Sequence, residues 1–226
     1  MSRIVVMGAG SWGTTVAKVI ADGGRDVVLW GRRQDVVDEI NNQHRNGDYL
    51  PGVNLPANLR ADSTIAAVLK EAEMVFLSVP SQSLRGNLSE WGALIRPDAI
   101  LVSLMKGVEQ DTGMRMSEVI AATTGFPESQ IAVISGPNLA LEIANQEPTA
   151  SVAASSSQKT AEAVAAVSSN SYFTTFTNTD VIGTEFGGIL KNLIAVAIGI
   201  VNGVGYGENT KASIMTRGLA EISRFA

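Results

Sequence analysis

The sequence predicts an α/β fold, in which a doubly wound, mainly parallel sheet is followed by the start of an all-α domain. Two observations lead to this prediction. Short runs rich in Val, Ile and Leu alternate with segments of helical hydrophobic spacing over the first two-thirds of the chain, as in successive βαβ units. The short runs have little polar alternation, which is typical of parallel strands covered by helices on both faces.

Each element has its own signal. We expect strands at the apolar runs of residues 4–7, 27–30, 74–79, 100–104 and 131–134. We expect helices where apolar residues recur at helical spacing, at residues 12–21, 35–43, 64–72 and 83–94. Gly and Pro punctuate residues 46–56, which predicts an irregular loop over the sheet, and residues 155–157 form a short polar hinge.

The character of the sequence changes after residue 179. Residues 185–204 are rich in Gly, Ala, Ile and Val and predict a core helix, and residues 211–226 predict an amphipathic one. The longest uninterrupted apolar run, residues 193–201, is far shorter than the roughly 20 residues that cross a bilayer, so we expect no membrane span. We divide the chain into a domain at 1–179 and a helical domain at 180–226. No cap signal closes that helical domain, and we expect it to be incomplete.

Composition excludes several classes of function. Hydrophobic residues make up 45% of the 226 residues, as in a globular protein. A net charge of -5 argues against a nucleic-acid partner, because such binding needs a basic face. The absence of cysteine excludes thiolate catalysis and Cys-ligated metals, and we predict no metal site. His44 is the only histidine, so we expect the acid–base chemistry elsewhere.

The first apolar run is too short for a secretory signal, which favours a cytoplasmic protein.

A glycine motif follows the first predicted strand. Gly8, Gly10 and Gly13 form G-x-G-x-x-G where the strand ends and a helix begins, a context that supports dinucleotide binding. Gly8 permits the tight turn, Gly10 leaves room for a pyrophosphate, and Gly13 lets the helix pack closely on the strand. The alternative is a merely tight strand-to-helix turn. With this motif, the predicted sheet is Rossmann-like.

Two arginines follow the second strand, where an acidic residue often binds the ribose 2'-hydroxyl. Arg32 and Arg33 stand there instead. Guanidinium groups suit a 2'-phosphate, which favours NADPH over NADH, with use of both left open. The alternative is a solvated pair of arginines at the start of a helix.

Two lysines are further candidates. Lys106 follows the strand at residues 100–104, and the turn Ser135-Gly136-Pro137-Asn138 follows the next one, both at the edge where doubly wound sheets bind ligands. Plain turn chemistry is the alternative. Lys191 lies inside the most apolar helix, beside Asn192. Desolvation lowers the pKa of a lysine and suits it to proton transfer near neutral pH, whereas a lysine that snorkels to solvent is the alternative.

These motifs together resemble the NAD(P)-dependent glycerol-3-phosphate dehydrogenase family in its soluble bacterial form, over essentially the whole chain. The motifs are GAGSWG (8–13), LWGRR (29–33), YLPG (49–52), KG (106–107), SGPNLA (135–140), LKN (190–192) and GENTKA (207–212). The resemblance implies reversible hydride transfer between NAD(P)H and dihydroxyacetone phosphate. The product is sn-glycerol 3-phosphate, which supplies glycerophospholipid synthesis.

The resemblance also implies roles for individual residues. Those that would contact the dinucleotide are Ser11, Trp12, Arg32, Arg33, Lys106 and Ala140. Lys106, Gly136, Asn138 and Lys191 would bind the substrate. Lys191 would be the acid–base residue, oriented by Asn192. The partner would be a small-molecule substrate, and a homodimer stays open.

Two departures from the family pattern bear on these roles. Many members have Ser or Thr at the position of Asn138, although an amide also donates hydrogen bonds. The family continues with an aspartate beside the catalytic lysine and an Arg–Asn pair for the substrate phosphate, which have no counterpart in residues 1–226. Two alternatives to the dehydrogenase therefore stay open, a non-catalytic dinucleotide-binding module and a reductase of another small carbonyl compound.

Overall fold

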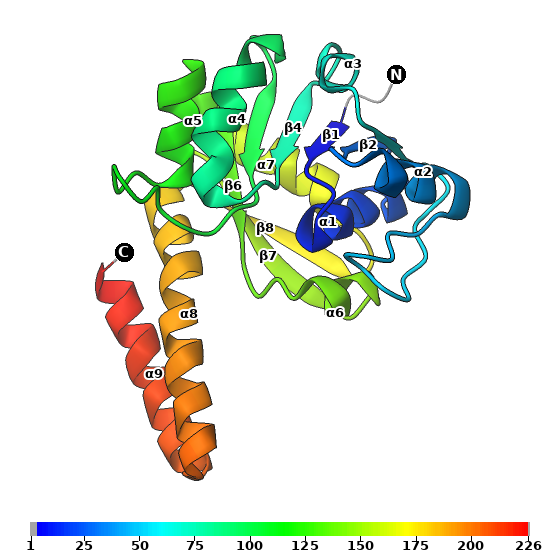
Figure 1. Cartoon of the computed structure of the whole chain (residues 1–226). Helices are drawn as coiled ribbons and strands as arrows, with labels where there is room; N and C mark the ends of the chain where they lie inside the picture. Colours follow the sequence, from blue (N-terminus) through cyan, green and yellow to red (C-terminus); the bar gives the residue numbers. More distant parts are fainter. Residues whose placement is uncertain (1–3, 226) are drawn as a thin grey trace.

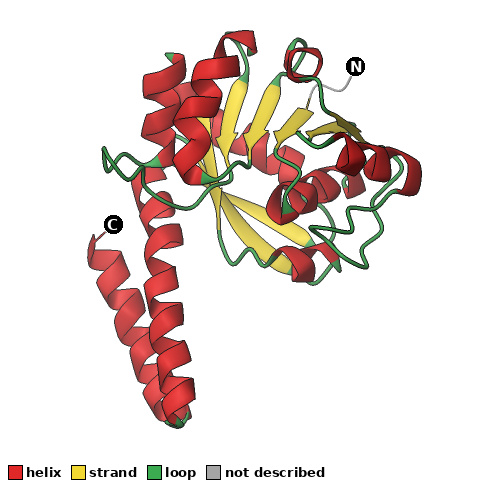
Figure 2. Ribbon diagram, viewed as in Figure 1, coloured by secondary structure: helices red, strands yellow, loops and turns green. Residues whose placement is uncertain are grey.

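The computed structural model describes residues 4–225. Within this part, the strands form an eight-stranded sheet in the order β3-β2-β1-β4-β5-β6-β7-β8, with helices on both faces (Figures 1 and 2). The strands are β1 (Ile4–Met7), β2 (Val27–Trp30), β3 (Leu59–Asp62), β4 (Met74–Leu77), β5 (Ile100–Ser103), β6 (Ile131–Ser135), β7 (Thr149–Ala154) and β8 (Phe173–Asn178). Among the strand pairs of residues 4–225, only β6–β7 is antiparallel. The predicted doubly wound, mainly parallel sheet is confirmed.

The helices cover the sheet and continue beyond it. They are α1 (Ser11–Asp22), α2 (Gln34–Gln43), α3 (Ile65–Leu69), α4 (Leu84–Trp91), α5 (Met116–Thr124), α6 (Ala140–Ala144), α7 (Gln158–Ser168), α8 (Val181–Val204) and α9 (Glu208–Phe225). Short 3-10 turns are η1 (Ser81–Ser83), η2 (Gly92–Leu94) and η3 (Glu128–Gln130). The helix expected at 83–94 is α4 between two such turns, and the one expected at 64–72 is shorter. The end of the last predicted helix, at residue 226, lies outside the described residues.

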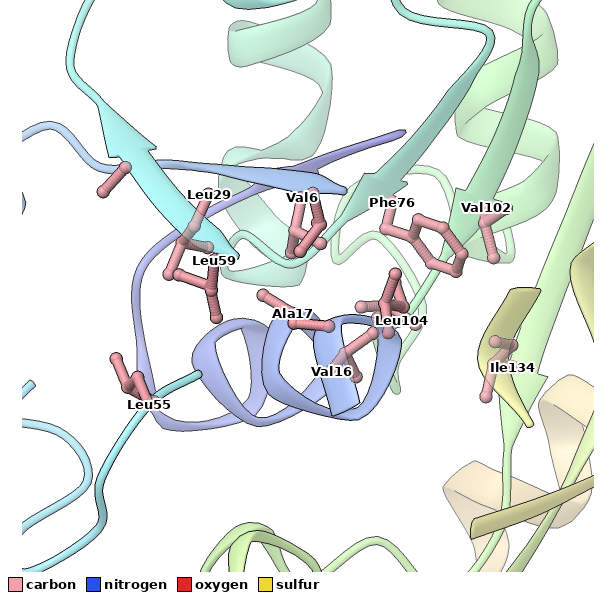
Figure 3. Close-up of a cluster of buried hydrophobic side chains, with 14 of the residues drawn as sticks. Val6, Val16, Ala17, Leu29, Leu55, Leu59, Phe76, Val102, Leu104 and Ile134 are labelled. Carbon is pink, nitrogen blue, oxygen red and sulfur yellow. The ribbon is translucent and has the colours of Figure 1, made fainter. Parts of the chain in front are cut away.

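Two hydrophobic clusters hold the sheet between its helical layers, because neighbouring residues of a strand point to opposite faces. Val6 packs with Val16 and Ala17 of α1 on one face (Figure 3). Val5 and Met7 belong to the cluster on the other face, with residues of α4 and α5. Each large apolar side chain buried in this way stabilises the fold by about 1.5–3 kcal/mol. The core therefore fixes the carboxyl ends of the central strands, where the candidate site lies.

The sequence analysis did not predict three of the strands, β3, β7 and β8. β3 is a short edge strand that carries Arg60 and Asp62, and β7 consists of Thr, Ala, Ser and Val, so neither has the apolar run of a central strand. In β8, the buried Phe173 and Thr175 alternate with the exposed Thr174 and Phe176. That alternation is a strand signal, which the search for uniformly apolar runs misses.

Helices α8 and α9 form a hairpin that extends away from the sheet (Figure 1). Helix α8 begins three residues after β8 ends, and the predicted boundary at 179–180 falls in that connection. Among the described residues, α8 is the one helix long and apolar enough to cross a membrane by length and composition, with a mean hydropathy of 1.6. The core helix of a soluble protein meets the same criterion, but only 11% of the apolar window of α8 is buried, so within residues 4–225 it is not the core helix that the sequence predicted. The expectation of no membrane span therefore stays a prediction.

Candidate active site

A cleft of about 810 Å³ opens at the carboxyl ends of the central strands. It lies where the strand order reverses between β1 and β4, which is where doubly wound sheets bind their ligands. Its walls come from the turns after β1, β2, β5 and β6 and from the segment after β4, which includes Ser78 and Pro80. The predicted site residues that line it are Gly8, Gly10, Trp12, Arg32, Lys106 and Asn138. A volume of this size accommodates a cofactor or a small-molecule ligand.

The three glycines of the motif have different surroundings. Gly8 has a φ of +124°, and a Cβ there would lie 2.3 Å from the carbonyl oxygen of Ser78. A Cβ at Gly13 would lie 1.9 Å from the carbonyl oxygen of Gly8. Gly10 has no atom within 4 Å of a Cβ position, although it lines the cleft. The fold itself requires glycine at Gly8 and Gly13, whereas at Gly10 the open space beside the backbone suits a ligand.

Helix α1 presents its N-terminus to this cleft. Its N-cap is Gly10, no side chain caps it, and its first turn carries no acidic residue. The first backbone N–H groups of a helix lack intrahelical partners and carry the positive end of the helix dipole. This end of α1 is therefore suited to bind a phosphate group.

The loop at residues 46–56 holds the glycine turn from outside. Buried Asn46 donates from its side-chain Nδ2 to the carbonyl oxygen of Ala9 (3.0 Å) and to Thr14 Oγ1 (2.8 Å). The hydroxyl of Ser11 donates to the carbonyl oxygen of Tyr49 at 2.6 Å. Sequence reasoning assigned no role to Asn46 or Tyr49. The Pro and Gly residues around Tyr49 showed a loop, but only the fold shows which turn that loop contacts.

The two arginines after β2 occupy different environments. Arg32 lines the cleft. Arg33 forms ion pairs with Asp35 and Asp48, and its Nη1 lies 2.7 Å from Asp48 Oδ2. These hydrogen bonds raise the pKa of Arg33 above its usual value. Arg32 is therefore the better placed of the two for a ligand in the cleft.

Lys106 and Lys191 converge on one backbone carbonyl. The Nζ of Lys106 donates to the carbonyl oxygen of Gly136 at 3.0 Å, and the Nζ of Lys191 donates to the same oxygen at 2.8 Å. One neutral oxygen cannot balance two ammonium charges, so this wall of the site attracts anions. Lys106 comes from the turn after β5, Lys191 from α8 and Gly136 from the turn after β6. The fold brings these three segments together.

Half-buried Lys106 carries the clearest electrostatic signature of the site. Burial, followed by the nearby charge of Lys191, lowers the pKa of Lys106 to about 8. Both causes disfavour the ammonium form. Such perturbed groups are common at functional sites. Sequence analysis gave Lys106 no such signature, because its burial beside Lys191 arises only in the folded chain.

The remaining predicted residues lie around this carbonyl. Both polar atoms of the Asn138 side chain are buried without a hydrogen-bond partner within residues 4–225, and a polar ligand in the cleft would satisfy them. Ala140 begins α6, and its carbonyl oxygen accepts from Thr15 Oγ1 at 3.2 Å. Trp12 donates from Nε1 to the carbonyl oxygen of Leu104 at 3.1 Å. Asn192 is exposed on α8, and its orienting role stays a prediction.

The fold is of the Rossmann type, and this cleft lies at the edge of the sheet where such folds bind dinucleotides. The N-terminal part of the NAD-dependent glycerol-3-phosphate dehydrogenase family matches residues 3–161, and its C-terminal part matches residues 180–226. The chain belongs to this family.

Individual relatives agree with this assignment. The glycerol-3-phosphate dehydrogenase (NAD(P)+) of Leifsonia xyli is 61% identical over 98% of this chain, and that of Corynebacterium diphtheriae is 55% identical over 98%. This chain spans 60% and 67% of their lengths, respectively. The crystal structure of glycerol-3-phosphate dehydrogenase from Coxiella burnetii has a TM-score of 0.88 and 35% identity, and the match covers 99% of this chain and 68% of that one.

Proposed function

We propose that this chain binds NADPH or NADH and transfers a hydride to dihydroxyacetone phosphate, which gives sn-glycerol 3-phosphate for glycerophospholipid synthesis. The observation that carries the proposal is the convergence of Lys106 and Lys191 on the Gly136 carbonyl, beside the cleft that begins at the glycine turn. The names of the relatives and their family support the same reaction.

The residues of the cleft fit a dinucleotide. The open space at Gly10 and the uncapped N-terminus of α1 suit the pyrophosphate, and Arg32 suits a 2'-phosphate. The other proposed contacts come from Ser11, Trp12, Lys106 and Ala140. Arg33 would join them after its ion pairs with Asp35 and Asp48 break. Bound NAD(P)H would supply the hydride.

The two lysines act on the substrate. Lys191 polarises the carbonyl and donates a proton to the oxygen as it becomes an alkoxide. Lys106 attracts the anionic substrate, and Gly136 and Asn138 border it. Asn192 orients Lys191. In the reverse direction, Lys191 accepts the hydroxyl proton of sn-glycerol 3-phosphate.

The wider assignments are part of the same proposal. The protein works in the cytoplasm on a small-molecule substrate, without a membrane span, and a homodimer fits the proposal. Residues 1–179 form the dinucleotide-binding domain, and 180–226 belong to the helical domain that carries the acid–base residue.

Family membership favours the dehydrogenase over the two alternatives. Oxidation of NADPH, followed at 340 nm with dihydroxyacetone phosphate, tests the reaction directly. Binding of NADPH without turnover of any carbonyl compound would support a binding module. Preferred turnover of ketopantoate or a β-keto acid would support the other reductase.

Replacing Arg32 by alanine is expected to weaken NADPH binding by about 10- to 100-fold, because a charge-assisted hydrogen bond contributes roughly 1.5–3 kcal/mol. The dissociation constant of NADH should change much less, since it lacks the 2'-phosphate. Fluorescence titration with each cofactor measures both constants. Arg60→Ala removes an exposed arginine of β3 and is the control. An unchanged NADPH dissociation constant in Arg32→Ala would exclude this role.

The affinity for dihydroxyacetone phosphate is expected to fall as pH rises through about 8, because the pKa of Lys106 lies there. Below that pH the ammonium is charged and attracts the phosphate; above it the charge is lost. Binding measured by calorimetry from pH 7 to 9.5 tests this. Lys106→Met should bind weakly with no such decline. Constant affinity of the unmodified protein across the range would contradict the role of Lys106.

A further inference from the structure

Helix α8 carries two charged residues, Glu185 and Lys191, and the functional proposal uses only the second. The side chain of Glu185 is 5% exposed. Burial of a carboxylate is costly unless it is paired and hydrogen-bonded. The surroundings of Glu185 therefore call for an explanation.

Three donors from the start of α5 satisfy this carboxylate. Glu185 accepts from Arg115 Nη1 at 2.7 Å, from the backbone N–H of Ser117 at 3.0 Å and from the hydroxyl of Ser117 at 2.5 Å. Arg115 is itself held by Glu118, with Nη2 at 2.8 Å from Oε1. The carboxylate thus fastens α8 to a helix that belongs to the core of the sheet domain.

The contacts of Glu185 with Arg115 and Ser117, called the clamp from here on, lie less than two turns of α8 before the lysine. Glu185, Gly188 and Lys191 follow one another at intervals of three residues, so each lies about 60° around the helix axis from the next, and Glu185 lies about 120° from Lys191. Each step advances about 4.5 Å along the axis. A Cβ at Gly188 would lie 2.3 Å from Ser135 Oγ, so the helix backbone lies close to the end of β6 between the two charged residues. The three contacts join α8 to α5, to β6 and to the Gly136 carbonyl.

This arrangement makes the location of the lysine depend on the carboxylate. A helix moves nearly as a rigid body over two turns, so a shift or rotation at residue 185 is carried to residue 191. Removal of the carboxylate would also leave Arg115 partly buried with one acidic partner fewer, which favours rearrangement at this contact.

We propose that Glu185 is a positioning residue, which sets the register of α8 against α5 and β6 and so holds the Lys191 ammonium at the Gly136 carbonyl beside Lys106. The effect of Glu185 on catalysis rests on the proposed function. Its effect on the position of Lys191 can be tested without measuring turnover.

The pH dependence of Lys106 modification provides the readout. The charge of Lys191 is one cause of the lowered pKa of Lys106, so Lys106 reports whether Lys191 is in place. Trace acetylation with acetic anhydride over a pH series, quantified on Lys106 by mass spectrometry, gives the titration midpoint. In Glu185→Ala the midpoint is expected to rise above about 8 but to stay below the ordinary 10.5, because burial, the larger cause of the lowered pKa, remains. NADPH affinity should change little, because Glu185, Arg115 and Ser117 do not line the cleft at the glycine turn.

Two further variants keep the test decisive. Ser117→Ala removes one hydroxyl that donates to the Glu185 carboxylate, so it should raise the Lys106 midpoint by less than Glu185→Ala. It replaces Glu185→Ala in the test if that variant does not fold. Glu208→Ala removes a carboxylate that is 88% exposed at the start of α9 and should leave the midpoint unchanged.

The outcomes separate this inference from the proposed function. An unchanged Lys106 midpoint in folded Glu185→Ala, or in Ser117→Ala if the former does not fold, overturns the positioning role. Failure of the unmodified chain to bind NADPH overturns the proposed function, whereas the labelling result still decides the role of Glu185.

Discussion

Lys191→Met is expected to lower kcat for the reduction of dihydroxyacetone phosphate by about 10²–10⁴-fold, the usual contribution of a general acid. The methionine keeps most of the side-chain length but has no proton to donate and no charge to polarise the carbonyl. NADPH binding should persist, because the glycine turn and Arg32 are unchanged. Steady-state kinetics and fluorescence titration measure the two effects separately.

Lys191→Arg distinguishes proton transfer from charge. The guanidinium keeps the positive charge but does not give up its proton. It should therefore stay nearly as slow as Lys191→Met if the proton is what matters. Lys106→Met is the matched variant and should act mainly on KM. A Lys191→Met protein with kcat within threefold of the unmodified chain would exclude Lys191 as the acid.

Gly13→Ala is expected to destabilise the protein by about 1–3 kcal/mol or more, the usual cost of overpacking. The added methyl group would lie 1.9 Å from the carbonyl oxygen of Gly8 and 3.1 Å from Ser78 Cβ. Because the nearest atom belongs to the backbone, the turn itself must move. Urea unfolding should show the loss of stability, and NADPH binding should be lost because the α1 amides move with the turn.

Gly10→Ala should show the opposite combination. Its Cβ meets no protein atom within 4 Å, and its φ of -76° is accessible to alanine, so the loss of stability should not exceed about 1 kcal/mol. NADPH binding should nevertheless fall at least about tenfold, because the methyl group occupies the space for the pyrophosphate. Gly86→Ala, in the exposed interior of α4, is the control and should stabilise by about 0.5–1 kcal/mol. Equal loss of stability in Gly10→Ala and Gly13→Ala would contradict this distinction.

The central strands and the glycine turn were predictable because their signals are local. β1 and β2 match their predicted bounds, since a strand buried on both faces must be apolar throughout. Lys191 was predictable as a candidate because a charge inside an apolar helix needs a reason. The same reasoning would have marked Glu185, the more buried of the two charged residues on α8, as a candidate, although not its partners Arg115 and Ser117.

The rest of the site depends on contacts that no local pattern encodes. The shared Gly136 carbonyl joins three segments far apart in the chain. The capture of Arg33 by Asp48 depends on the path of the loop after α2, and so does the support that Asn46 gives to the glycine turn. The lowered pKa of Lys106 follows from its burial and from the proximity of Lys191, both of which arise only in the folded chain.

A crystal structure of this chain with NADPH would show where the dinucleotide lies. We expect the pyrophosphate on the backbone N–H groups at the start of α1, the adenosine end beside Arg32, and the nicotinamide ring next to the Lys106 and Lys191 ammonium groups. A dinucleotide bound outside the cleft, or a nicotinamide ring directed away from both lysines, would contradict this expectation.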